Sequence, residues 1–470
     1  MTISTPVIWV VFPLVIAAIC LPLYNRRIVS MIIASVAAFG LSLLAAFLPE
    51  ELTLTLGPMI IEITESLGFL GRQINLPYTM LPFVAFIYGV TGLWILSSNL
   101  PGVPATFRPL SLVITASLTA ALGVEPFLYA ALLIQTAVLV SVPLLSTPGE
   151  RGHQGILRYL GLMTIAMPFI LIAGWLLTGV VILPPDSPLI GQSAIVLGLG
   201  FALWLGVFPF HSWVPMVSHR SHPTVVSFLL FVLPTTILVF GLNFLNRYAF
   251  LRTSEAIFEI IRIIGVVMIV FGGVWMAVQE ELKRAFGFAV LVETGFSLVA
   301  VGLANSGGLK WLMMLFPVRA LGYWLWGYAL ARFEYHCGSL ELSAVRGYAR
   351  KLPLLSAGLV LAHLSVAGLP LLASFPIKIA ILSQALVEGR GLGVWSFIGN
   401  LGFFLFSIRL MLNLLLPVEA DTPPIGLMEQ KLSEYLPVVL MVAVLVILGL
   451  FPGFFSLDLT TILTAFPQLQ

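Results

Sequence analysis

Charged residues are scarce in this sequence. Only 9% of its 470 residues are Asp, Glu, Lys or Arg, whereas an ordinary soluble domain carries about 25%. So few charged side chains cannot cover a surface that faces water. The 22 Lys and Arg residues nearly balance the 20 Asp and Glu residues, and the net charge of +2 supplies no strongly basic face. The composition therefore excludes a soluble globular domain and a nucleic-acid-binding protein.

Cysteine is almost absent as well. Cys20 and Cys337 are too few to build a disulfide framework or a zinc site. The sequence also lacks a phosphate-binding loop, an HExxH motif, a CxxC motif and a nucleophile elbow. What it has instead is 60% hydrophobic residues in long runs, with 31 prolines and 41 glycines spread along them. This pattern predicts an all-α polytopic membrane protein, in which polar residues at membrane depth carry the function.

The apolar runs predict about fourteen transmembrane helices, because a spanning helix needs about 20 apolar residues. The runs are too long to be the strands of a membrane β-barrel. The polar stretch from Glu50 to Leu76 is expected to be an external loop, with a hairpin as the alternative. The apolar piece 375–387 continues the twelfth span after a break. The predicted spans are 6–23, 28–49, 78–98, 107–124, 126–146, 157–182, 192–210, 223–246, 257–278, 285–304, 309–331, 353–373, 392–416 and 434–456.

Basic residues predict the orientation of the chain in the membrane. The first span has no basic residue before it, and Arg26 and Arg27 follow it, which is the reverse of a secretory signal. We therefore expect a retained first helix. More of the 22 Lys and Arg residues follow odd-numbered spans than even-numbered ones. By the positive-inside rule, this places the N-terminus, and with an even number of spans also the C-terminus, outside a cell inner membrane.

Ionisable residues inside the predicted spans are the candidate functional residues, since a charge at the bilayer centre costs about 2.5–3.5 kcal/mol. These residues are Glu293 in span ten, Arg319 in span eleven, His363 and Lys378 in span twelve, and Arg409 in span thirteen. Burial disfavours the charged forms of carboxyl and amine groups, so Glu293 and Lys378 are candidates to exchange protons. Arg319 can tune charge but cannot release a proton.

Each of these residues also has a purely structural reading. A Glu293–Arg319 pair can simply fix helix packing, and Lys378 and Arg409 can extend to the membrane surface. A satisfied interior histidine is as good an interpretation of His363 as a member of a proton relay.

Two predicted helices carry breaks rich in proline and glycine. Proline inside a helix removes a backbone hydrogen bond, and irregular backbone at membrane depth persists only where protein or a water-filled cavity satisfies it. Paired breaks in the two halves of a chain favour an inverted-repeat transporter. Simple kinks are the alternative. The candidate hinge residues are Pro209, His211, Pro215 and Pro223 around the end of span seven, and Gly368, Pro370 and Pro376 in span twelve.

Three separated motifs resemble those of one family. FPFHSWVP followed by SHPTVVS resembles PFHxWLPxAHxxAPxPVS, ELKRAFGFAVLVETGF resembles DLKRxLAYSSISHxGY, and LSVAGLPLLASFPIK resembles LSLAGLPPLxGFxxK. These are signatures of the antiporter-like subunits of respiratory complex I, a family that includes Mrp-type antiporter subunits and membrane hydrogenase subunits. The resemblance implies two inverted five-helix repeats, spans four to eight and nine to thirteen. The chain then divides into N-terminal helices with an external loop (1–105), a first repeat (106–250), a second repeat (251–416) and a C-terminal helix and tail (417–470).

The chain departs from the family pattern in its first repeat. The family's usual glutamate in span five and lysines in spans seven and eight fall on Gln135, Trp204 and about Ile237, and none of these carries a proton. The span-five placement is open, because Glu125 lies upstream of Gln135. The first half-channel is therefore expected to be degenerate. In the second repeat, Glu293 replaces the usual histidine or glutamine, Arg319 replaces a lysine, and the terminal lysine is kept as Lys378.

The resemblance implies a membrane subunit of a complex I-type NADH:quinone oxidoreductase-like assembly that translocates protons through Glu293, Arg319, Lys378 and His363. Electron transfer would belong to partner subunits, so the chain is expected to hold no metal, flavin, iron–sulfur cluster or nicotinamide. Whether it counts as an enzyme stays open. An Mrp-type cation/proton antiporter or proton-coupled uptake complex is one alternative, and a non-conducting structural subunit is another.

Overall fold

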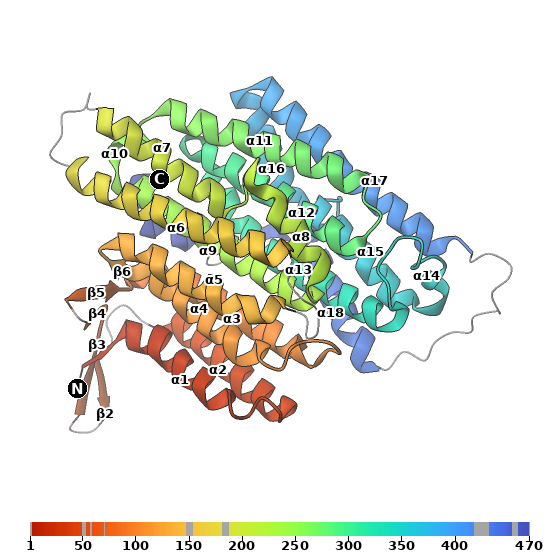
Figure 1. Ribbon diagram of the computed structural model, residues 1–470, viewed down its shortest axis with the longest axis horizontal. Helices are drawn as coiled ribbons and strands as arrows, with labels where there is room; N and C mark the ends of the chain where they lie inside the picture. Colours follow the sequence, from red (N-terminus) through yellow and green to blue (C-terminus); the bar gives the residue numbers. More distant parts are fainter. Residues whose placement is uncertain are drawn as a thin grey trace.

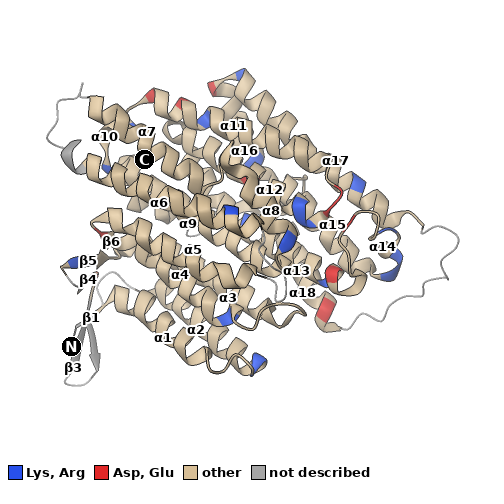
Figure 2. Ribbon diagram, viewed as in Figure 1, with Lys and Arg blue, Asp and Glu red and all other residues tan. Residues whose placement is uncertain are grey.

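The computed structural model describes residues 2–48, 53–56, 59–69, 71–146, 154–180, 188–417, 432–453 and 459–469. This part of the chain is mostly helical, and Figure 1 shows long helices packed side by side with a few short strands near the N-terminus. Most of each ribbon carries no charged residue (Figure 2). The architecture therefore matches the predicted class of an all-α membrane protein.

The first half of the chain supplies the helices on both sides of the first break. A π-helical turn, η1 (Val7–Val11), leads directly into the first of them. They are α1 (Phe12–Cys20), α2 (Arg27–Phe47), η2 (Tyr78–Met80), α3 (Leu81–Leu96), η3 (Ser97–Asn99), α4 (Phe107–Gly123), η4 (Phe127–Tyr129), α5 (Ala130–Leu145), α6 (Gln154–Val180), α7 (Pro188–Trp204), η5 (Phe210–Ser212), α8 (Trp213–Arg220), α9 (Pro223–Arg247) and α10 (Ala249–Arg252).

The second half continues with helices of more varied length. The longest has 30 residues and the twelfth predicted span is divided into two helices. They are α11 (Glu255–Ala277), α12 (Leu282–Gly302), η6 (Ala304–Ser306), α13 (Gly308–Cys337), α14 (Tyr348–Lys351), α15 (Pro353–Ala367), α16 (Phe375–Glu388), α17 (Arg390–Leu415), α18 (Leu432–Leu450), η8 (Leu459–Ala465) and η9 (Pro467–Leu469).

Nine helical stretches of the described chain are long and apolar enough to cross a membrane. Four shorter apolar stretches accompany them: Val7–Cys20, Phe107–Gly123, Pro188–Trp204 and Pro353–Ala367. Each of the predicted ranges contains a helix, and α13 occupies the range 309–331. The helix α15 is shorter than its predicted span because the chain leaves the helix at Gly368.

Short strands form where an external loop was the first expectation. Strand β2 (Thr53–Leu56) pairs antiparallel with β3 (Met59–Thr64), and β4 (Ser66–Phe69) pairs antiparallel with β5 (Arg72–Asn75). The stretch therefore contains the hairpin that the sequence suggested, and it occurs twice. The N-terminal strand β1 (Thr2–Ser4) adds to β3 in parallel, and β6 (Val124–Glu125) adds to β5.

The centre of the bundle is formed by α9 and α12, which are the most buried of the long apolar helices. By contrast, α2, α6 and α18 keep most of their apolar side chains on the outside, as expected of helices that face lipid. The helix α11 packs on one side against α12 and on the other against α17, which runs along the edge of the bundle in Figure 1. A charged residue on α12 is therefore enclosed by protein.

Glycines bring α11 and α17 unusually close together. A Cβ atom at Gly273 of α11 would overlap the carbonyl oxygen of Gly399 on α17, and one at Gly402 would overlap the carbonyl of Gly273. Only residues without a side chain allow this approach. Asn400 directly follows Gly399 on α17, so the close crossing fixes the position of Asn400 in the bundle.

Candidate functional site: a buried cluster of charges

Glu293 lies near the middle of α12 and is 1% exposed. The residues on either side of it are all buried, so the carboxylate has no route to bulk water along its own helix. An isolated charge in such a place is strongly disfavoured unless it is paired. The structure supplies cations from two other helices.

Arg319 of α13 is the first of these cations. Its Nε donates to Oε2 of Glu293 at 3.1 Å, and its second terminal nitrogen donates to the backbone carbonyl of Glu293 and to the hydroxyl of Ser297, each at 2.7 Å. The guanidinium is 4% exposed. Three bonds to one turn of α12 hold it in a fixed orientation, which suits the planar fork of an arginine.

Lys378 of α16 is the second cation. Its Nζ lies 2.6 Å from Oε1 of Glu293 and 3.2 Å from Oδ1 of Asn400 on α17, which accepts a hydrogen bond. The aromatic rings of Phe296 and Phe403 lie beside the ammonium, with centroids at 4.3 and 5.2 Å. Ring faces attract a cation, so the two rings add favourable contacts to the ion pair with Glu293.

The helix break explains how Lys378 reaches this position. The helix α15 ends at Ala367, and Gly368 takes the left-handed conformation with φ of +86°. A Cβ atom on Gly368 would lie 3.1 Å from Cδ of Lys378, so glycine provides both the turn and the space. Lys378 follows in the first turn of α16. The break thus directs the lysine into the bundle toward Glu293.

The cluster carries unequal charge when all its groups are ionised. Glu293 contributes one negative charge, whereas Arg319 and Lys378 contribute two positive ones. Arginine does not release its proton in proteins. Lys378 is therefore the cation of the cluster that can lose a proton, and Glu293 is the acceptor within reach. The arrangement can exchange a proton between an amine and a carboxylate away from bulk water.

His363 lies outside this cluster. Its ring is fully buried in α15, its Nδ1 donates to the carbonyl of Leu359 at 2.7 Å, and its centroid lies 3.7 Å from that of Trp326. Within the described chain, its Nε2 has no hydrogen-bond partner, and no hydrogen bond or ion pair joins it to the charge cluster. The structure places His363 beside the rings of Trp326 and Phe406.

Arg409 serves the end of another helix. One of its terminal nitrogens donates to the carbonyl oxygens of Ala277 and Gln279, where α11 ends. The last carbonyls of a helix have no partner within the helix, and a cation there also complements the helix dipole. Arg409 is thus bonded to backbone within the protein.

The predicted hinge residues lie at helix starts and ends. At the first break, Pro209 precedes η5, and His211 stacks on Phe208 and meets Phe271 edge to face. Proline is tolerated in the first turn of a helix, where its missing N–H is not needed. Accordingly Pro215 lies in the first turn of α8, Pro223 and Pro376 lie in the first turns of α9 and α16, and Gly368 and Pro370 lie between α15 and α16.

The first half holds neutral groups at the positions singled out from the sequence. Gln135 donates to the hydroxyl of Thr164 at 2.9 Å, and Trp204 and Ile237 are fully buried. Glu125 is exposed in β6, away from the interior. None of the buried three can gain or lose a proton near neutral pH.

Sequence reasoning missed two members of the cluster. Ser297 lies one turn after Glu293 and accepts a hydrogen bond from Arg319. Asn400 accepts a hydrogen bond from Lys378. Both are neutral, so they do not stand out within an apolar run. The signal in the sequence was an amide side chain, Asn400, within the apolar run of span thirteen. A polar group in such a run needs a hydrogen-bond partner.

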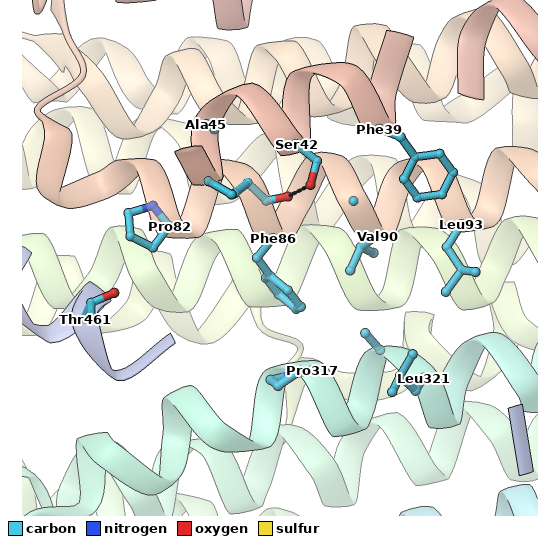
Figure 3. A pocket seen from close by; sticks show the side chains of 14 residues that line it. Phe39, Ser42, Ala45, Pro82, Phe86, Val90, Leu93, Pro317, Leu321 and Thr461 are labelled. Atoms are coloured by element: carbon cyan, nitrogen blue, oxygen red, sulfur yellow. Dashed lines mark hydrogen bonds between the residues drawn. The ribbon is translucent and has the colours of Figure 1, made fainter. Parts of the chain in front are cut away.

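A separate apolar cavity lies between α2, α3 and α13. It has a volume of about 540 Å³, and Figure 3 shows Phe39, Phe86 and Leu321 among its lining. The hydroxyl of Ser42 donates to the carbonyl of Ala85 at 2.7 Å, and the described lining includes no ionisable side chain. This cavity therefore has no group for proton transfer.

Comparison with known proteins agrees with the motifs. Residues 185–405 match the family described as "NADH:quinone oxidoreductase/Mrp antiporter, TM". The predicted family resemblance is thereby confirmed for this region. The matched segment contains Glu293, Arg319 and Lys378 as well as both helix breaks.

Curated relatives carry the description "NADH-quinone oxidoreductase subunit N". The protein of Thermobifida fusca is 27% identical over 274 residues, which cover 57% of this chain and 49% of the relative. The protein of Heliobacterium modesticaldum is 25% identical over 291 residues, which cover 59% and 60%. Each match therefore spans less than two thirds of the relative.

Solved structures resemble the chain over nearly its whole length. One is from the Mrp complex of Dietzia sp. DQ12-45-1b, with a TM-score of 0.79, 14% identity and coverage of 98% of this chain and 97% of the other. Another is from respiratory complex I of Thermus thermophilus with bound NADH, with a TM-score of 0.76, 18% identity and 99% coverage of both chains. At such identities the likeness establishes the fold alone.

Proposed function

We propose that the chain is an antiporter-like membrane subunit of a complex I-type assembly and takes part in proton translocation, with electron transfer in partner subunits. The observation that carries this proposal is the buried Glu293–Arg319–Lys378 cluster beside a broken helix. A charged triad away from bulk water has a large cost of desolvation, and ionisable residues inside membrane proteins characteristically serve a function. The description of the curated relatives as subunits of NADH-quinone oxidoreductase supports the same assignment.

In the proposed mechanism, a proton moves between Nζ of Lys378 and Oε1 of Glu293, which lie 2.6 Å apart. Transfer from the ammonium to the carboxylate leaves a neutral amine and a neutral acid beside the permanent charge of Arg319. A change of charge in a neighbouring subunit would alter the balance between these two states. His363 is a further proposed member of the proton pathway, and the hinge residues of both breaks are proposed to have a structural role.

The proposed topology has fourteen spans, with both termini outside the cell inner membrane. Spans four to eight and nine to thirteen would form two inverted repeats, within the ranges 106–250 and 251–416. The presence of a helix in every predicted range supports this count. The neutral residues Gln135, Trp204 and Ile237 support a first repeat that does not itself carry protons.

Proton uptake by membrane vesicles that contain the complete assembly tests the proposal. The double variant Lys378→Ala with Glu293→Gln should abolish NADH-driven proton uptake, while NADH oxidation in partner subunits continues. Lys310→Ala, which removes an exposed lysine at the start of α13, is the control and should behave as wild type. Unchanged uptake in the double variant would instead make the chain a structural subunit.

An Mrp-type cation/proton antiporter is the second candidate, because the structure from the Mrp complex has a TM-score as high as 0.79. Purification of the chain with its native partners separates the two candidates. Partners that oxidise NADH and reduce quinone support the first candidate. Partners without redox cofactors, together with proton movement driven by a sodium gradient, support the second.

A further inference from the structure

Asn400 occupies a position that the proposed function has not yet used. It lies on α17, is 6% exposed, and has both ends of its amide bonded to the broken twelfth span. Its Oδ1 accepts from Nζ of Lys378 at 3.2 Å, and its Nδ2 donates to the carbonyl of Ala367 at 2.8 Å. An ammonium only donates and a carbonyl only accepts, so these partners fix which end of the amide is which.

The carbonyl of Ala367 is an unusual partner. Ala367 is the last residue of α15, and the last carbonyls of a helix have no partner within it. Asn400 satisfies this carbonyl with one end and holds the lysine of the following helix with the other. One side chain therefore joins the end of α15 to the reactive group of α16, across the break.

We infer that Asn400 is a positioning residue for Lys378: it holds the ammonium beside Glu293 and favours the protonated state of the lysine. Its carbonyl oxygen accepts a hydrogen bond from the ammonium but cannot take the proton. The charged groups that face Lys378 are Glu293 from α12 and Arg319 from α13. Asn400 is the neutral acceptor from α17, and the rings of Phe296 and Phe403 complete the surroundings.

This role predicts opposite effects of two substitutions. Asn400→Leu removes the acceptor, so Lys378 should release its proton more readily. Asn400→Asp adds a second carboxylate, which balances the surplus positive charge and should hold the proton on Lys378. A residue that only supported packing would lose activity in both variants without opposite shifts in pH dependence.

The experiment rests on the proposed function and measures the pH profile of proton uptake in vesicles that hold the full assembly. Asn400→Leu should move the alkaline limb of the profile down by about one pH unit, the effect of losing one hydrogen bond to a charged group. Asn400→Asp should move it up and lower the maximal rate. Asn400→Ser shortens the side chain without adding bulk or charge, and should shift the profile in the same direction as Asn400→Leu.

The control is Ser407→Ala on the same helix. Ser407 is buried too, but its hydroxyl bonds to the carbonyl of Phe403 on its own helix, so the pH profile should not move. Immunoblots of the membranes establish that each variant is present at the wild-type level. If both Asn400→Leu and Asn400→Asp reduce uptake with an unshifted profile, the inference is wrong although the function stands. If Lys378→Ala leaves proton uptake unchanged, the proposed function is wrong, and the inference about Asn400 is wrong with it.

Discussion

Glu293 is the residue on which the charge cluster depends, because its two carboxylate oxygens serve different cations. Oε2 accepts from Arg319 and Oε1 contacts Lys378. Loss of Lys378 leaves a balanced ion pair, whereas loss of Glu293 leaves two positive charges facing each other in an apolar interior. Single substitutions at Glu293 and Lys378 should therefore lower the free energy of unfolding by different amounts.

We expect Glu293→Leu to lower the free energy of unfolding by about 3 kcal/mol or more, the usual cost of removing one partner of a buried ion pair. Lys378→Met should cost about 1 kcal/mol or less, since the remaining pair stays neutral. Unfolding of the purified protein in detergent micelles measures both. The variant that combines Glu293→Leu with Lys378→Met should lose less stability than the sum of the two single losses. Equal losses for the two single variants would contradict this account.

The sequence predicted the charged members of this site but not their neutral partners. A charge within an apolar run is conspicuous, and Glu293, Arg319 and Lys378 come together in the structure. The partners depend on which faces of four helices meet, and that information is absent from any one segment. For the same reason the sequence could not tell that His363 would bond to Leu359 and pack against Trp326.

At the scale of the elements, glycines allow α11 and α17 to cross at very short range. Gly273→Ala should reduce stability by about 1–3 kcal/mol, because the new methyl group would overlap the carbonyl of Gly399. It should also disturb proton uptake, since Asn400 follows Gly399 directly. Gly391→Ala on α17 is the control. Its added methyl group would meet open space, so stability should be kept or increased by up to about 1 kcal/mol.

His222 caps the start of α9 in the connection that follows α8. Its Nδ1 accepts from the backbone N–H of Thr224, and its Nε2 donates to the carbonyl of Pro101. This pattern requires the neutral ring, and burial lowers the pKa of His222 below its ordinary value. The unfolded chain therefore binds the proton more readily than the folded one.

The resulting prediction is a loss of stability as the pH falls below about 6.5, the ordinary pKa of histidine. His222→Asn keeps an acceptor for the N–H of Thr224 and should weaken this pH dependence. His222→Ala should cost about 1 kcal/mol near pH 8, where the wild-type ring is neutral. Thermal unfolding between pH 8 and pH 5 measures the difference. Identical pH dependence in wild type and His222→Asn would show that another group titrates.

The helix breaks could be predicted from the sequence, whereas the positions of the strands could not. Proline and glycine end helices by local sterics, so Pro209 and Gly368 mark the breaks without tertiary information. The strands β2 to β5 have four to six residues each. Strands this short form only because they pair with one another, with β1 and with β6, which come from distant parts of the chain.

At the scale of the whole molecule, the two ends of the described chain lie on the same face. Strand β1 pairs with β3, and the backbone N–H of Gln468 donates to the side chain of Asn246 at the end of α9. A cavity of about 380 Å³ on this face is lined by residues that include Asn75, Asn246 and Ala465. Both ends therefore belong to the side of the molecule that carries the strands.

Labelling with a membrane-impermeant maleimide tests the proposed orientation. In a Cys337→Ser background, Ser66→Cys and Gln468→Cys should both react from outside intact cells, because both positions are exposed on this face. Arg350→Cys, on the exposed turn between α13 and α15, should react only after the membrane is opened. Labelling of Ser66→Cys and Gln468→Cys from opposite sides would exclude an even number of spans.

The crossing of α11 and α17 also limits how the protein can move. Each backbone lies in the space that a side chain would need on the other, so neither helix can slide or rotate without the other. Because α11 also packs along α12, the three helices form a rigid frame around Glu293 and Asn400. If the proposed function is correct, we expect turnover to proceed by rotation of the Lys378 side chain and local rearrangement at the α15–α16 junction, while the frame itself stays still.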